Sequence, residues 1–242
     1  MLAGFTTRDA GSPPDSYAGN LGYHVGDDPG NVDTWRAKLQ AETGPLSWMS
    51  QVHGTTILEA EPHVQEADGL LLRPGQGGAV MVADCVPLLM VGTTEGTDPD
   101  LGLGSDLGSG SGATGKVTIG AVVHVGRAGL LGGIATKAAG ILREEGATTI
   151  RAVIGPAICG DCYEVGEELA ARSEQIIPGS SSVTRWGSRG IDIPGTLERE
   201  LRILGVEVDR VLVCTMEDER FFSHRRQHGR AGRFAGVLVL AP

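Results

Sequence analysis

Three residues that can bind a transition metal each close an apolar run of the sequence. His53 follows PLSWMSQV, Cys85 follows GAVMVAD and His124 follows TIGAVV. Each run is typical of a buried strand, and open α/β sheets bring the ends of their strands together to form sites. We therefore expect the three side chains to meet at one centre.

Two imidazoles and one thiolate suit zinc, and three protein ligands leave the fourth tetrahedral position open for water or substrate. Such a zinc would be catalytic. The same ligand types also occur in copper sites, so copper is an alternative metal. On residue type alone, His53 could instead form a hydrogen bond in a loop, Cys85 could be an inert buried thiol, and His124 could be a core histidine.

Cys85 and His124 also allow a different chemistry. A thiolate beside an imidazole base is the arrangement of cysteine hydrolases, so the pair could cleave an amide bond. Zinc ligation and nucleophilic attack are mutually exclusive uses of the same sulfur. Asp84, next to Cys85, is a candidate for orienting a ligand or transferring a proton, although a cap or a turn would use the same carboxylate.

The elements that must position these residues alternate between helix and strand. One helix is expected to begin near Asn31 or Asp33, which are good N-cap residues, and to stop at Gly44. Another should begin at Pro194 and end at Gly205, because proline is tolerated in a first helical turn. Interleaved helices and strands predict a layered sheet-and-helix architecture. The remaining helices are expected at 130–146 and 165–176, and strands at 150–155, 208–215 and 236–241.

The composition suits one large folded domain over residues 1–242. With 242 residues, 40% of them hydrophobic, the chain can bury a full core. Residues 93–116, TTEGTDPDLGLGSDLGSGSGATGK, are rich in glycine, serine and aspartate and cannot build a core of their own. We expect them to form a flexible surface insertion, with a substrate lid as the alternative.

Charge and apolar patterning exclude several classes of function. Thirty acidic against 20 basic residues give a net charge of -10, which opposes attraction to nucleic acid or to an anionic membrane. The beginning of the sequence, MLAGFTTRDAG, lacks the features of a signal peptide, and no stretch approaches the roughly 20 apolar residues of a membrane span. The expected protein is cytoplasmic and binds neither nucleic acid nor membrane.

The four cysteines fit a reducing compartment better than a disulfide framework. Cys159 and Cys162 form a C-x-x-C, which suits a redox motif or half of a structural zinc site, but the sequence has no second C-x-x-C. The alternative is a pair of small residues in a turn that leads into the helix expected at 165–176.

Six ordered motifs carry a resemblance to a known family. They are SWMSQVHG, ADGLL, VMVADCVPLL, HVGRAGL, IGPAICGDCYEVG and CTMEDERFFSHRRQHGRAGR, and the similarity begins earlier, at GNLGYHVGDDPGNV. In this order they resemble the laccase-domain or YfiH-type family, also called multicopper polyphenol oxidase-like. The resemblance implies an α+β fold of α/β/β/α layers with mixed sheets. It also implies that His53, Cys85 and His124 bind the metal.

The function implied by the resemblance is purine nucleoside chemistry. Members are described as phosphorolysing adenosine, inosine and methylthioadenosine and as deaminating adenosine, so a purine nucleoside and phosphate would be the partners. Zinc can lower the pKa of a bound water to about 7, which suits attack on the purine C6. Some relatives are described as editing a cell-wall peptide precursor, the role open to a Cys–His hydrolase. A copper polyphenol oxidase is the other alternative, but the six histidines include no His-x-His pair, so several coppers are not expected.

Arginines are the expected phosphate ligands, because a guanidinium binds oxyanions through two hydrogen bonds. Arg225 and Arg233 match the family's FFS-x-RR pattern and its later Gly-Arg, and Arg36 matches an arginine after the GDDP segment. Gln51 could hydrogen-bond a base or orient the loop that carries His53.

One departure from the family pattern lies beside the third metal ligand. The family commonly has His-Ala-Gly-Trp-Arg-Gly, whereas here Arg127 replaces the tryptophan and Ala128 the arginine. An aromatic surface is lost at that position, and Arg127 could restore the charge from a neighbouring angle. His224 likewise stands where the family often has tyrosine.

Overall fold

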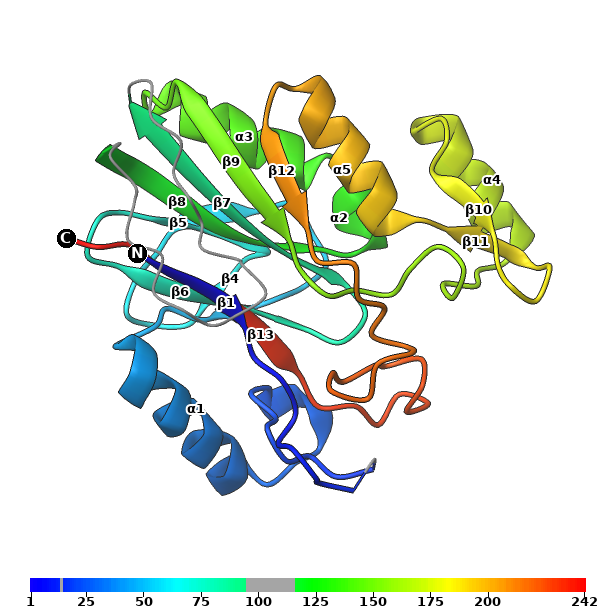
Figure 1. The fold of residues 1–242 in the computed structure, drawn as a ribbon, viewed down its shortest axis with the longest axis horizontal. Helices are drawn as coiled ribbons and strands as arrows, with labels where there is room; N and C mark the ends of the chain where they lie inside the picture. Colours follow the sequence, from blue (N-terminus) through cyan, green and yellow to red (C-terminus); the bar gives the residue numbers. More distant parts are fainter. Residues whose placement is uncertain (14, 95–115) are drawn as a thin grey trace.

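Two β-sheets lie face to face between two layers of helices in the computed structural model, which describes residues 1–13, 15–94 and 116–242 (Figure 1). Within these residues the larger sheet has the strand order β12 (Glu207–Arg210), β9 (Thr149–Ile154), β7 (Val86–Thr94), β8 (Lys116–Val125), β5 (Gly69–Leu72) and β3 (Ile57–Glu59). The smaller sheet has the order β1 (Leu2–Phe5), β13 (Phe234–Val239) and β6 (Gly77–Val82). Both parallel and antiparallel pairs occur in the larger sheet.

The helices cover the two outer faces of this sandwich (Figure 1). Those on the larger sheet are α2 (Arg127–Leu131), α3 (Ile134–Glu144) and α5 (Ile193–Ile203). Helix α1 (Pro29–Thr43) packs on the smaller sheet. The expected α+β fold with α/β/β/α layers and mixed sheets is therefore confirmed.

The shorter elements lie around the sandwich. They are the 3₁₀ turn η1 (Tyr23–Val25), the parallel pair β2 (Met49–Ser50) and β4 (Gln65–Glu66), helix α4 (Glu167–Ile176) and the hairpin β10 (Ser181–Val183) and β11 (Arg189–Ile191). Helix α4 packs with this hairpin beyond one end of α5 (Figure 1). No helix in the described part of the chain is long and apolar enough to cross a membrane.

Strand residues alternate between two apolar layers, as the two-residue period of a strand requires. In β7, Leu88 and Met90 pack toward the helices, whereas Leu89 belongs to the core between the two sheets. In β8, Val122 belongs to the same inter-sheet core. His124, two residues later, therefore projects from the same face, at the end of the space between the sheets.

Helix α1 begins earlier than the sequence predicts. The N-cap is Asp28, whose carboxylate accepts a hydrogen bond of 2.7 Å from the Gly30 N–H, and Pro29 occupies the first turn. The expected start near residues 31–33 was therefore wrong, because the Asp-Pro pair is the stronger start signal. The predicted end is confirmed, since the helix stops at Thr43 and Gly44 follows with a φ of 79°.

The other predicted helices and strands are present, except that one predicted helix is interrupted and one predicted strand ends early. Two helices, α2 and α3, replace the single helix expected at 130–146, because Gly132 and Gly133 interrupt it and Gly133 adopts a φ of 70°. The helices expected at 165–176 and 194–205 are present as α4 and α5, and the strands expected at 150–155 and 236–241 as β9 and β13. The strand expected at 208–215 ends already at Arg210, because the chain then leaves the sheet.

The predicted insertion falls mainly on residues 95–115, which lie outside the described residues. Its first two residues, Thr93 and Thr94, belong to β7, and Lys116 begins β8. These two strands are antiparallel neighbours.

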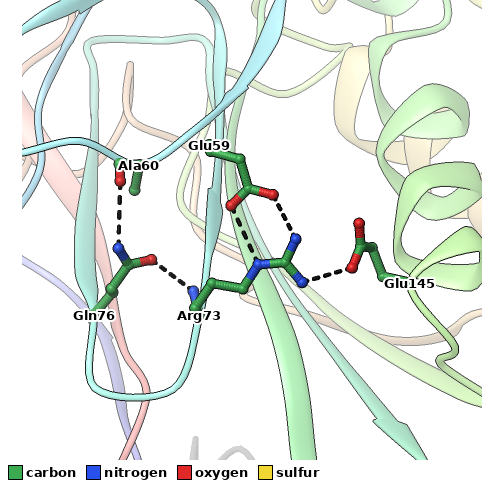
Figure 2. A network of polar contacts seen from close by, with 5 residues as sticks. All are labelled: Glu59, Ala60, Arg73, Gln76 and Glu145. Atoms are coloured by element: carbon green, nitrogen blue, oxygen red, sulfur yellow. Dashed lines mark hydrogen bonds and ion pairs between the residues drawn. The ribbon is translucent and has the colours of Figure 1, made fainter.

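A polar network ties the edge of the larger sheet to α3 (Figure 2). The Arg73 guanidinium forms ion pairs of 2.6 Å with Glu59 of β3 and with Glu145, the C-cap of α3. Gln76 accepts a hydrogen bond from the Arg73 N–H and donates one to the Ala60 carbonyl. The ion-paired side chains are well exposed, so the network orients this corner more than it stabilises the fold.

Candidate metal centre and its cavity

The structure brings His53, Cys85 and His124 together. One ligand atom from each side chain lies within 4.8 Å of the others, and the Cys85 Sγ is 3.8 Å from the His53 Nε2. The two imidazole rings are edge to face, with their centroids 4.6 Å apart. Since zinc binds sulfur at about 2.3 Å and nitrogen at about 2.0 Å, a single ion can reach all three atoms.

The three side chains reach this point from different kinds of backbone. Cys85 lies in the turn between β6 and β7, and His124 is the last residue but one of β8. His53 lies in a loop with a φ of 60°, because the run before it forms a strand only over Met49–Ser50. The strand-end expectation therefore describes Cys85 and His124 but was wrong for His53.

The His53 loop is fixed to β6 by Gln51. The Gln51 side-chain amide donates to the Met81 carbonyl at 2.7 Å, and its oxygen accepts from the Met81 N–H at 2.8 Å. The side-chain amide of Gln51 thus pairs with the Met81 backbone through two hydrogen bonds, as a residue of a neighbouring strand would. Of the two roles expected for Gln51, these contacts match the orientation of the ligand loop, and the residue also lines the cavity beside it.

Asp68 contacts two of the three ligand residues, His53 and His124. Its fully buried carboxylate is 2.8 Å from the His124 Nδ1 and accepts hydrogen bonds from the backbone N–H groups of His53 (3.0 Å) and Gly54 (2.6 Å). The His124 Nδ1 is thereby occupied, which directs its Nε2 to the cluster. Sequence reasoning gave Asp68 no role, although the acid at the second position of the ADGLL motif was a usable signal, because a buried carboxylate needs a partner.

Electrostatics favour the ionised thiol at this centre. Burial opposes ionisation of Cys85, but the neighbouring His124 and His53 outweigh it and lower the pKa of Cys85 to about 6. Burial also disfavours the charged form of His124, yet Cys85 and Asp68 together raise the pKa of His124 to about 9. Without metal the pair is a thiolate beside an imidazolium. The thiolate is the form that binds metal or acts as a nucleophile.

Gly126 closes the centre on the side of α2. A Cβ at this position would lie 3.1 Å from both the Cys85 Sγ and the His53 Cδ2. Only a residue without a side chain leaves both ligands undisturbed.

A cavity of about 350 Å³ opens over the cluster. Its volume lies in the range of small-molecule sites. Besides the three ligands, arginine, histidine and tyrosine side chains line the cavity. They are His24, Arg127, Tyr163, His224, Arg225 and Arg233. His24 and Tyr163 were missed by sequence reasoning as cavity residues, because nothing in their local sequence shows that they approach the metal ligands.

Three of the four predicted substrate arginines border the cavity. Arg127 begins α2, the Arg225 guanidinium lies over the Tyr163 ring at 5.1 Å, and Arg233 donates hydrogen bonds to the carbonyls of Ala231 and Gly232. Arg127 lies in α2, whereas Arg225 and Arg233 both lie in the long connection between β12 and β13, so positive charge reaches the cavity from two parts of the chain. Burial lowers the pKa of Arg233, although a guanidinium stays charged at neutral pH.

Arg36 lies elsewhere and is not among the residues that line this cavity. Its guanidinium stacks over the rings of Trp48 and Tyr23, at 3.8 Å and 4.4 Å from their centroids, and donates to the Leu21 carbonyl. These contacts attach α1 to the loop that carries His24.

Asp84 connects the Cys85 turn to the C-terminal loops. One carboxylate oxygen accepts from the Thr215 hydroxyl at 2.7 Å and the other from the Arg225 N–H at 2.8 Å. The Asp84 carbonyl accepts from the Ile158 N–H. Both carboxylate oxygens thus hold loops in place, and a φ of 89° gives this turn its shape.

Comparison with known proteins identifies the family. A family model described as multi-copper polyphenol oxidoreductase laccase matches residues 2–97 and 113–241, which is nearly the entire chain. The chain belongs to this family. The resemblance of its six motifs is thereby confirmed.

Two sequence relatives of this chain share one name, and two solved structures share its fold. A protein of Mycobacterium tuberculosis named purine nucleoside phosphorylase is 37% identical over 246 residues, covering 96% of this chain and 89% of that protein. One of Corynebacterium glutamicum with the same name is 38% identical over 251 residues, covering 98% and 93%. YlmD from Geobacillus stearothermophilus has a similar structure, with a TM-score of 0.79, 27% identity and 99% and 92% coverage. The structure of the hypothetical protein YfiH from Bacillus licheniformis is also similar, with a TM-score of 0.78 and 26% identity. The match covers 98% of this chain and 92% of that one.

The multicopper part of the laccase family's description finds little support in this centre. Four of the six histidines line the cavity, but only His53 and His124 belong to a ligand cluster in the described residues. Two imidazoles and one thiol can hold one ion, whereas several coppers need many more imidazole ligands. The metal chemistry that fits the geometry is that of a single ion.

Proposed function

We propose that the protein is a zinc-dependent purine nucleoside phosphorylase that cleaves adenosine, inosine and methylthioadenosine and also deaminates adenosine. The observation that carries this proposal is the three-ligand cluster in a cavity bordered by three arginines. The name shared by relatives that cover nearly the entire chain supports the same activity. Four free thiols suit a reducing cytoplasm, where we place the enzyme.

His53, Cys85 and His124 are the residues that would hold the ion, and their types and mutual distances fit zinc. Bound there, zinc would supply Lewis-acid chemistry and, with three protein ligands, would keep one position open. Asp68 keeps the His124 imidazole oriented, and Gly126 leaves room beside the sulfur. Copper is the alternative metal, because two histidines and a cysteine also suit it.

The arginines Arg127, Arg225 and Arg233 would bind phosphate at the cavity wall. In phosphorolysis, a phosphate oxygen forms a bond to the ribose C1′ while the bond from C1′ to the purine nitrogen breaks, and the electron pair leaves with the base. Guanidinium groups hold the phosphate in line and offset its charge. Asp84 contributes by fixing the backbone of Arg225.

Tyr163 and His24 are suited to the nucleoside. The Tyr163 ring provides an aromatic surface in the cavity, where the tryptophan that is common in the family is replaced by Arg127. Burial, with nearby Arg233 and Arg36, lowers the pKa of His24 and keeps this imidazole neutral at pH 7, so that it can both donate and accept a hydrogen bond.

A Cys–His hydrolase is the second candidate, and one observation favours it. Cys85, His124 and Asp68 follow one another as thiol, imidazole and carboxylate, the order used in nucleophilic triads. With no metal bound, the Cys85 thiolate would attack an amide such as that of a cell-wall peptide precursor, and the His124 imidazolium would give its proton to the leaving amine as the carbon–nitrogen bond breaks.

Product analysis tests the proposal. Zinc-loaded protein is incubated with adenosine, with and without phosphate, and adenine, ribose 1-phosphate and inosine are separated by chromatography. Phosphate-dependent formation of adenine and ribose 1-phosphate supports phosphorolysis, and inosine supports deamination. If a zinc-containing protein forms none of these products, the nucleoside proposal fails. Cleavage of an amide substrate by the metal-free protein would instead support the hydrolase.

A further inference from the structure

A second cluster of metal-binding side chains lies beside the first cavity. Cys159, Cys162, Cys214 and Glu217 each offer one ligand atom, and these four atoms all lie within 4.8 Å of one another. The three cysteines are free thiols, with Cys162 buried and the other two half-buried. Four ligands from two separate segments therefore surround one point.

Each segment supplies its two ligands from a tight turn of the same kind. The Cys162 N–H donates to the Cys159 carbonyl at 3.0 Å, and the Glu217 N–H donates to the Cys214 carbonyl at 3.0 Å. The ligands of both pairs are thus three residues apart and lie on the same side of their turn. A search for a second C-x-x-C fails because the second half of the cluster is C-x-x-E.

The two turns are fixed together by backbone contacts. Ala157 and Cys214 form a parallel β-bridge, in which the Thr215 N–H donates to the Ala157 carbonyl at 3.1 Å. The Cys159 N–H donates to the Cys214 Sγ at 3.4 Å. Backbone donors to sulfur are a common way to orient and charge-balance a ligating thiolate.

We propose that Cys159, Cys162, Cys214 and Glu217 hold a structural zinc ion in a closed, four-ligand site. Three thiolates and one carboxylate complete the tetrahedron that structural zinc prefers, and binding releases the protons of the thiols. One Glu217 oxygen is paired with the Arg185 guanidinium at 2.6 Å, which leaves the other for the metal and offsets the negative charge of the site.

The position of this zinc gives it a role in shaping the first cavity. The Cys159 turn leads into Tyr163, and Thr215, next to Cys214, donates its hydroxyl to Asp84. A metal crosslink between the two turns would therefore hold the cavity wall and the Cys85 turn in register. The inference rests on these contacts and is independent of the nucleoside activity.

Metal content tests the proposal directly. The protein is loaded with zinc, separated from free metal, and its zinc is counted by mass spectrometry. We expect two ions per chain for the unmodified protein, one for Cys85→Ser, and one for the double variant Cys159→Ser and Cys214→Ser. A Cys85→Ser protein that holds no zinc would overturn the second site, as would a disulfide among Cys159, Cys162 and Cys214 in freshly purified protein.

Cobalt distinguishes the two sites even where the double variant folds poorly. Thiolate-to-cobalt charge-transfer absorption scales with the number of sulfur ligands, and Cys85→Ser leaves only the three-thiolate site. We expect the cobalt form of Cys85→Ser to absorb about three times as strongly per ion as a one-thiolate site. Absorption typical of oxygen and nitrogen ligands alone would contradict the assignment.

The carboxylate ligand has a matched control two residues away. Removing a residue that only hydrogen-bonds a metal ligand typically lowers metal affinity by roughly 10- to 100-fold. Glu217→Gln in the Cys85→Ser background removes a ligand itself, so zinc affinity should fall by at least that much. Glu219→Gln, which removes a neighbouring negative charge, should bind zinc as before. Equal affinity in the two variants would remove Glu217 from the ligand set and overturn the four-ligand site.

Discussion

Asp68 joins two of the proposed metal ligands through one buried carboxylate. It orients the His124 ring and binds the backbone of the His53 loop. Replacing Asp68 with Asn keeps the shape but turns one acceptor into a donor and removes the charge. We predict that Asp68→Asn lowers zinc affinity at this site by roughly 10- to 100-fold, measured by competition with a chelator.

Asp209 provides the control for this variant. It lies in β12 and forms an ion pair with Arg151 at 2.9 Å, away from the cavity. Asp209→Asn should leave zinc affinity unchanged. If Asp68→Asn binds zinc as tightly as Asp209→Asn does, the carboxylate plays no part in ligand orientation.

The pH dependence of Cys85 reactivity follows from its pKa of about 6. Because this pKa is lowered, the thiolate persists at neutral pH and is lost only as the pH falls through about 6. We predict that in the metal-free protein the rate of Cys85 alkylation is nearly constant between pH 7 and 8 and drops below pH 6. Peptide mass spectrometry resolves Cys85 from the other cysteines.

His124→Gln is the informative comparison, because it removes a cationic neighbour of the sulfur. In this variant the alkylation of Cys85 should fall already between pH 8 and 7. Zinc should protect Cys85 in the unmodified protein. A rate that rises steadily up to pH 9 in both proteins would show that the histidine does not stabilise the thiolate.

At the level of single residues, the sequence identified side chains whose residue type indicates metal or phosphate binding. It did not identify the hydrogen-bond partners that hold those side chains in place. Metal ligands and arginines have recognisable residue types, so they could be proposed before the fold was known. Asp68 acts through hydrogen bonds to partners up to 56 residues away, and Gln51 through a pairing with Met81. Such partners become visible only when the chain is folded.

The connection from β8 to α2 is the element on which the geometry of the centre depends most closely. Gly126 lies at this junction, and an added Cβ would approach two ligands to 3.1 Å. We predict that Gly126→Ala folds but loses zinc affinity, because the sulfur or the ring must move. Thermal unfolding and a zinc titration of the same sample separate the two effects.

Gly140, in α3, is the matched glycine. A Cβ there would meet nothing within 4 Å, and alanine is the better helix former. Gly140→Ala should stabilise the protein by about 0.5–1 kcal/mol and leave zinc affinity unchanged. If Gly126→Ala also leaves zinc affinity unchanged, the ligands tolerate a Cβ at position 126 and the prediction is wrong.

Element boundaries were predictable where a local signal decides them. Gly44 and Pro194 mark a helix end and a helix start in both sequence and structure. The run 208–215 has the apolar pattern of a strand, but only its first half pairs with β9. The second half instead approaches Cys159, a tertiary contact that the pattern cannot encode.

At the scale of the whole molecule, positive charge gathers at one cavity of an acidic protein. The chain has a net charge of -10, yet Arg127, Arg225 and Arg233 share this cavity. We predict that Arg225→Ala raises the KM for phosphate at least tenfold, whereas Arg230→Ala, on the same loop but outside the cavity lining, changes it less than twofold. Steady-state kinetics with varied phosphate measure both.

If Arg225→Ala raised the KM for the nucleoside and left the KM for phosphate unchanged, Arg225 would contact the purine base and not the phosphate. Equal effects of the two substitutions would point to the general charge of the loop. Either result would contradict direct binding of phosphate by Arg225.

The layered fold was predictable from the interleaved helices and strands together with the family resemblance. The cavity was not, because its walls come from segments near residues 24, 127, 163, 225 and 233. No periodicity relates these positions. Their meeting depends on how the smaller sheet packs on the larger one, which the sequence pattern leaves open.

The most direct test of the account is the zinc dependence of phosphorolysis. Metal-free protein is mixed with adenosine and phosphate, and adenine is followed as zinc is added, with and without prior alkylation of Cys85. The account predicts no adenine without zinc, full activity once the His53, Cys85 and His124 centre is filled, and no recovery after alkylation. Full phosphorolysis by the metal-free protein, or by the alkylated one, would contradict it.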